Sequence, residues 1–203
     1  TDKYFNLIGR SITNAGDVFV LGYATPDKYK GEKKDRDKSN ESYKLYRISQ
    51  DDDDIIEFDL GFDDRFISNS TINCDFGDGQ MAIAGFYTDD RKSGKKAGIE
   101  GSFFYTINQS TLEPVSTSFE KFTTDFMKNF MSDRRAEKDR DLFNFKFRNL
   151  IRRKDGGAVM VAEQSYVQQH TTRSANGVTT TYYTYHNYDI IVVNVNPDGS
   201  ISW

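Results

Sequence analysis

The chain has 203 residues, of which 36% are apolar and 14% aromatic, and its formal net charge is −4. This composition is sufficient for a hydrophobic core, and the near balance of charge implies no strongly basic surface of the kind that binds nucleic acid, so we expect no nucleic-acid partner. The single cysteine, Cys74, excludes an internal disulfide. No run approaches about 18 consecutive apolar residues, so we expect no membrane-spanning helix.

Three similar units follow one another along the chain, at about 5–62, 64–118 and 142–203. In each unit a strand candidate leads into a glycine-containing turn, at 14–17, 76–79 and 154–157. Glycine supplies the positive φ that tight hairpin turns require, and Asn or Asp favours the same geometry. Three more apolar runs follow each turn. The sequence therefore predicts three four-stranded antiparallel meanders.

The second strand of each unit is apolar without a polar break, at 18–21, 81–84 and 158–162. A sheet with one wet face would alternate instead, so we expect these sheets to be covered on both faces. One segment, about 119–141, has helical character, and a single helix cannot cover three sheets. Neighbouring sheets can cover one another. We therefore predict an all-β chain of three meanders stacked as propeller-like blades, with one helical insertion.

Three blades are fewer than the four to eight of a typical propeller. The outer faces of the first and last blades would then be large apolar patches. We expect either a fragment of a larger propeller or self-association through these open blade faces.

The third unit resembles the repeats of uncharacterised β-propeller-like proteins of Bacteroidota, many of which are exported. The similarity lies in the strings GGAVMVAEQSYV at 156–167 and NYDIIVVNVNPDGSISW at 187–203. The resemblance implies a propeller-like fold and an extracytoplasmic location, periplasmic or at the cell surface. Because the family has no assigned chemistry, the resemblance implies no reaction.

Glu163 and Gln164 interrupt the apolar second strand of the third unit, where the other units have Gly22 and Gly85. A buried carboxylate needs a partner, so Glu163 either is hydrogen-bonded to the structure or belongs to a site near a sheet edge. The nearby arginines offer counter-charges: Arg148, Arg152 and Arg153.

Tyrosines gather between the second and third strands of the third unit: Tyr182, Tyr183, Tyr185 and Tyr188, with Tyr166 across the connection. They could form a stacking platform for a sugar ring or a peptide. The same string could equally extend a long hairpin with its tip at 175–177. The candidate binding residues are Glu163, Gln164, Tyr166, Tyr182, Tyr183 and Tyr185.

The second and third strands of each unit are joined by long polar connections, at 25–41, 88–100 and 167–187. In a stacked array equivalent connections emerge on one face, so they form either a shared binding surface or solvated loops.

Motifs for catalysis, metals and cofactors are absent from the sequence. His170 and His186 lack the spacing of a zinc site, and the acidic run 51–54 lacks that of a calcium loop. We therefore assign no catalytic residue, metal or cofactor. The preferred function is a non-enzymatic binding or scaffolding module for a protein, peptide or glycan. The alternative is a hydrolase or lyase with a central pocket, in which Glu163 is the acid or base.

Overall fold

A computed structural model describes residues 4–25, 42–50, 54–62, 65–89, 98–138 and 141–202. Most of the first two long connections, the acidic residues 51–53 and Trp203 lie outside these described residues.

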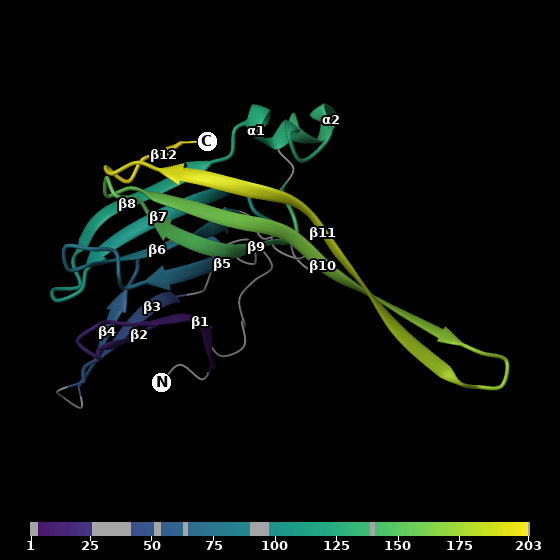
Figure 1. Cartoon of the computed structure of the whole chain (residues 1–203), viewed down its shortest axis with the longest axis horizontal. Helices are drawn as coiled ribbons and strands as arrows, with labels where there is room; N and C mark the ends of the chain where they lie inside the picture. The colour runs from purple at the N-terminus through teal and green to yellow at the C-terminus, as the bar shows by residue number, and fades with distance from the viewer. Residues whose placement is uncertain are drawn as a thin grey trace, which may run out of the picture.

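The chain forms three separate four-stranded antiparallel sheets, each built from consecutive strands (Figure 1). The first sheet contains β1 (Tyr4–Ile12), β2 (Val18–Thr25), β3 (Ser42–Ile48) and β4 (Ile55–Asp59). The second sheet contains β5 (Phe66–Asn73), β6 (Gln80–Thr88), β7 (Gly101–Asn108) and β8 (Pro114–Lys121). The third sheet contains β9 (Phe145–Arg152), β10 (Ala158–Arg173), β11 (Thr179–Val195) and β12 (Ile201–Ser202). The all-β class and the three antiparallel meanders are thus confirmed.

The same tight turn joins the first two strands of the first and third units. The Thr13 N–H donates to the Asp17 carbonyl at 2.9 Å, and Arg153 donates to Gly157 in the same way at 2.8 Å. Gly16 and Gly156 occupy equivalent places in the two turns, with φ of 95° and 91°. Only glycine adopts this backbone region without strain, which explains why the turns could be read from the sequence.

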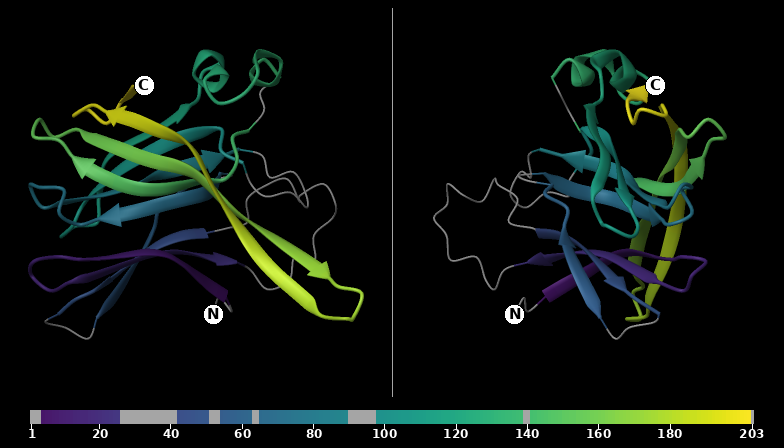
Figure 2. Two further views of the ribbon diagram at one scale, coloured as in Figure 1. Left: turned by 45° about the vertical axis from the view of Figure 1, so that its right-hand side comes forward. Right: turned by 90° about the vertical axis from the view of Figure 1, so that its left-hand side faces the viewer.

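The sheets pack face to face in chain order (Figure 2). Phe19 and Leu21 of the first sheet pack with Met81 and Ile83 of the second, in one buried cluster. The opposite face of the second sheet packs on the third, and that second cluster includes Phe86. Within the described part of the chain the sheets form an open stack and do not close into a ring.

Only the middle sheet is covered on both faces. Every residue of β6 after Gln80 is buried, whereas β10 alternates between buried and partly exposed residues up to Ala162. The expectation that all three second strands are covered on both sides is therefore wrong for the outer two sheets. Their outward faces have no neighbouring sheet among the described residues.

Two short helices, α1 (Thr124–Lys128) and α2 (Asp133–Ala136), occupy the insertion between the second and third sheets. The predicted helix began at Phe119, but Phe119 lies in β8 opposite Phe103, and their rings stack at 5.3 Å. The helix was predicted from the four-residue spacing of Phe122, Phe126 and Phe130. Strand pairing and the contact with Phe103 place Phe119, which precedes them, in β8 instead. Neither helix is long enough to cross a membrane, and the described residues contain no other.

Candidate functional site

The third sheet extends into a long two-stranded arm (Figure 1). β10 and β11 have 16 and 17 residues, against nine at most in the other strands, and they pair out to Arg173 and Thr179. A turn with Gly177 at φ 84° closes the tip. The segment 167–187 is therefore an extension of the hairpin, which was one of the two readings of its sequence. We call residues 165–188 the arm.

One face of the arm carries a row of stacked rings. Tyr166 and His186 lie opposite each other with ring centroids 4.6 Å apart, and Tyr188 stacks beside them at 5.9 Å from His186. Further out, His170 stacks on Tyr182 at 4.8 Å. We call these five residues the ladder face. Because their flat surfaces are turned toward one another, these rings mainly stiffen the hairpin.

The other face of the arm carries Tyr183 and Tyr185. Successive residues of a strand point to opposite faces, and Tyr185 pairs with Val167 while Tyr183 pairs with Gln169. Tyr183 and Tyr185 are 55% and 73% exposed. No stacking partner is recorded for either ring among the described residues. We call Val167, Gln169, Tyr183 and Tyr185 the platform face, because its rings are open to a ligand.

A cavity of about 710 Å³ lies at the base of the arm, where all three units meet. The first unit contributes Ile8 and Tyr23, and the second contributes the segment 66–70. The third contributes 142–146 and 165–167. Tyr166 and Val167, the first residues of the ladder and platform faces, both line this base cavity, so the cavity adjoins the start of the arm.

The wall of the base cavity mixes apolar and polar groups. Asn69, Asn144 and Lys146 are the larger polar residues that line it, together with Phe66 and Phe143. None of these residues was predicted from the sequence. Asn144 has a positive φ of 65°, which asparagine tolerates well.

Glu163 lies outside the base cavity, on the outward face of the third sheet. Its Oε2 accepts a hydrogen bond from Arg148 Nε at 2.9 Å, so one of the expected counter-charges is its partner. Arg153 instead bonds Asp155 and Asn194. These contacts give Glu163 a structural role.

The two equivalent turns also correct the alignment of the units. Counting from these turns, Gly22 matches Ala162, so Glu163 stands where the first unit has Tyr23 and not Gly22. Gln164 lies at a β-bulge between Glu163 and Ser165, and its amide donates to the Phe143 carbonyl at 3.1 Å. Gln164 thereby holds the start of the arm against the wall of the base cavity.

A second cavity of about 490 Å³ lies among the hairpin turns of the first two units. Arg47 and Asp17 form an ion pair there, with Nη2 and Oδ2 2.8 Å apart. The backbone N–H of Gln50, together with Arg47, lowers the pKa of Asp17. Burial raises the pKa of the Cys74 thiol. These groups bond one another and the backbone, so we assign this cavity a structural role.

The six sequence-predicted site residues therefore fall into three places. Glu163 and Gln164 lie at the root of the arm, Tyr166 and Tyr182 on the ladder face, and Tyr183 and Tyr185 on the platform face. Among the described residues, no group of three or more His, Cys, Asp or Glu side chains is arranged to hold a metal ion.

No protein-family model matches the chain, and no curated protein matches its sequence. The function is therefore argued from the site alone.

Proposed function

We propose that this chain is a non-enzymatic binding module that takes an uncharged glycan chain along the platform face and into the base cavity. The observation that carries the proposal is the pair of open rings, Tyr183 and Tyr185, on the face that Val167 joins to the cavity. Together they provide an extended surface that ends in a recess.

The chemistry of the arm suits a neutral polar ligand. From Gln164 to Tyr188 the chain has one formally charged residue, Arg173, among many Thr, Gln and Asn side chains. Sugar rings present apolar C–H faces that stack on aromatic side chains, and their hydroxyls bond amides and hydroxyls. An anionic polymer would require a cluster of basic groups instead.

The proposal also covers the type of fold and the location of the protein. We propose that the three sheets are blades of β-propeller type, which is supported by their chain order and by the proximity of their first strands, β1, β5 and β9. We also propose, from the resemblance of the third unit, that the protein works outside the cytoplasm as a scaffold in glycan processing.

The test is binding of the whole chain to a glycan array, followed by titration of the best glycan. A Tyr183→Ala, Tyr185→Ala variant should lose at least tenfold in affinity, since each stacked ring contributes roughly 1 kcal/mol. The matched control is Tyr182→Ala, Tyr188→Ala, which removes two tyrosines from the ladder face of the same arm. The control should bind within about threefold of the parent.

Two outcomes would contradict the proposal. Equal losses in both double variants would mean that the arm as a whole, and not the platform face, determines binding. Saturable binding to a peptide array, with no binding to any glycan, would mean that the ligand is a peptide and not a glycan. The alternative of a hydrolase or lyase with Glu163 as acid or base gains no support, because Glu163 lies outside the base cavity.

A further inference from the structure

The middle sheet shows how two sheets of this chain fit together. One of its faces, which includes Met81 and Ile83, packs on the preceding sheet, and the other, which includes Ala82 and Ala84, packs on the following sheet. We call these the backward and the forward face. Each contact in the molecule therefore joins a forward face to a backward face.

The equivalent turns identify the same two faces in the outer sheets. In the first sheet the forward residues Phe19 and Leu21 are buried against the second sheet, and their equivalents in the third sheet are Val159 and Val161. The backward residue Met160 of the third sheet is buried against the second sheet. Its equivalent in the first sheet is Val20.

Among the described residues, the forward face of the third sheet and the backward face of the first sheet are therefore left uncovered. Both are apolar in their middle. The uncovered forward face carries Ile151, Val159, Val161, Ile190 and Val192. The uncovered backward face carries Leu7, Ile12, Val18, Val20, Ile48 and Ile55.

Two ion pairs lie within these faces. Arg148 bonds Glu163 at the arm end of the forward face, and Lys44 pairs with Glu57 at 2.5 Å on the backward face. Arg10 also lies on the backward face. Paired charges cost less to cover than free ones, so these faces can be buried against a neighbour.

We propose that the occupant of both faces is a second copy of this chain. The forward face of each copy packs on the backward face of the other, so that two copies form a closed ring of six sheets. The two uncovered faces are complementary, because the chain already makes this contact twice internally and carries both halves of a third. Unlike surfaces that pair head to tail form a closed ring when the rotation per unit closes, and six is within the usual number of blades. The proposal does not depend on the ligand of the arm.

The first experiment measures mass by light scattering after size exclusion, at protein concentrations from about 1 to 200 µM. We expect twice the mass of one chain. Val192→Lys puts a charge on the forward face at a residue 54% exposed in the single chain, and it should give one chain. The matched control, Val115→Lys, changes a valine of β8 that is 53% exposed and lies outside the two uncovered faces. This variant should keep twice the mass of one chain.

A mixing experiment tests the pairing of unlike faces. Ile12→Lys disables only the backward face, so alone it should also be a single chain. Mixed with Val192→Lys it should form a one-to-one pair, because each variant keeps the face that the other lacks. Thermal unfolding of each variant alone checks that it is folded.

Three results of these experiments would overturn the proposal. The parent could remain a single chain at 200 µM, it could grow into open filaments of many copies, or Ile12→Lys could pair with itself. The last result would mean that like faces pair. The proposal would also fail if a longer natural chain had added repeats that cover both faces. Light scattering would then give that longer chain the mass of one copy.

Discussion

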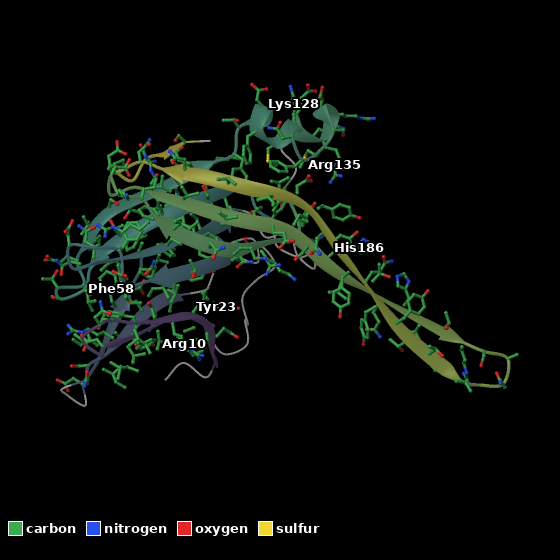
Figure 3. The ribbon with its side chains drawn as sticks, viewed as in Figure 1. Arg10, Tyr23, Phe58, Lys128, Arg135 and His186 are labelled. Atoms are coloured by element: carbon green, nitrogen blue, oxygen red, sulfur yellow. The ribbon has the colours of Figure 1, made fainter. Side chains whose placement is uncertain are left out.

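Tyr166 and His186 stack across the long hairpin, with ring centroids 4.6 Å apart and planes inclined by only 17°. His186 is labelled in Figure 3. Tyr188 hydrogen-bonds His186 Nδ1 through its hydroxyl at 3.2 Å. An isolated two-stranded hairpin is marginally stable in water. This aromatic group lies where the arm leaves the body of the protein, and it stabilises the pairing of the two strands there.

The first prediction concerns the stiffness of the arm. His186→Ala removes a ring that stacks on both Tyr166 and Tyr188, and the lost stacking is worth about 1 kcal/mol. Amides of the arm from Gln168 to Arg173 should then exchange with solvent about fivefold faster. Hydrogen exchange measured by mass spectrometry or NMR checks this.

The control for that experiment is Tyr185→Ala, which removes an exposed ring from the platform face. Its exchange rates in the same amides should change less than twofold. If both variants exchange equally fast, the stacked rings do not stabilise the arm more than any cross-strand pair does.

The second prediction separates Glu163 from ligand binding. Glu163→Gln keeps the shape of the side chain and removes its charge, and the Arg148 pair is partly exposed, so the free energy of unfolding should fall by less than about 1 kcal/mol. Affinity for the glycan found on the array should stay within twofold. A tenfold loss of affinity in a folded variant would mean that Glu163 takes part in ligand binding.

Much of the fold could be predicted because its signals are local. Gly16 and Gly156 marked the turns through their backbone requirement, and the Asn176-Gly177 pair marked the tip of the arm. The end of β8 could not be predicted in this way. Phe119 lies in a strand because its ring stacks on Phe103 of another strand. A helical spacing of phenylalanines in the sequence does not reveal such a contact.

The site was predictable only in part. The tyrosines were found because they are clustered in the sequence, but the register of β10 and β11 beyond the bulge at Gln164 decides which of them shares a face with Tyr166. The base cavity was missed altogether. It brings together Ile8, Asn69 and Asn144 from three units, so no single stretch of sequence contains it.

The third prediction tests which face of β10 is buried in the single chain. Met160 is fully buried against the second sheet, and Met160→Ala should lower the free energy of unfolding by about 2–5 kcal/mol. Val159→Ala, one residue earlier on the outward face, should cost no more than about 1 kcal/mol. Urea unfolding at a protein concentration low enough to keep single chains makes the comparison. Equal costs would mean that the two faces are not distinguished as described.

The fourth prediction concerns acid stability through Asp17. Hydrogen bonds from the Gln50 N–H and from Arg47 lower the pKa of this carboxyl in the folded chain. A carboxyl whose pKa is lower in the folded state than in the unfolded state binds more protons when unfolded. Its stabilisation is therefore fully present above the unfolded pKa of about 4, and it is lost as the pH falls through the folded value.

Asp17→Asn should accordingly reduce the free energy of unfolding by about 1 kcal/mol at pH 7, the scale of a partly exposed charge-assisted contact. The difference from the parent should shrink toward zero as the pH falls below about 3, because protonated Asp17 has lost the same interaction. Asp189→Asn removes one exposed carboxylate from β11 and serves as the control. Urea unfolding from pH 7 to pH 2.5 measures all three proteins, and an Asp17→Asn deficit that persists undiminished at pH 2.5 would show that the loss is steric and not electrostatic.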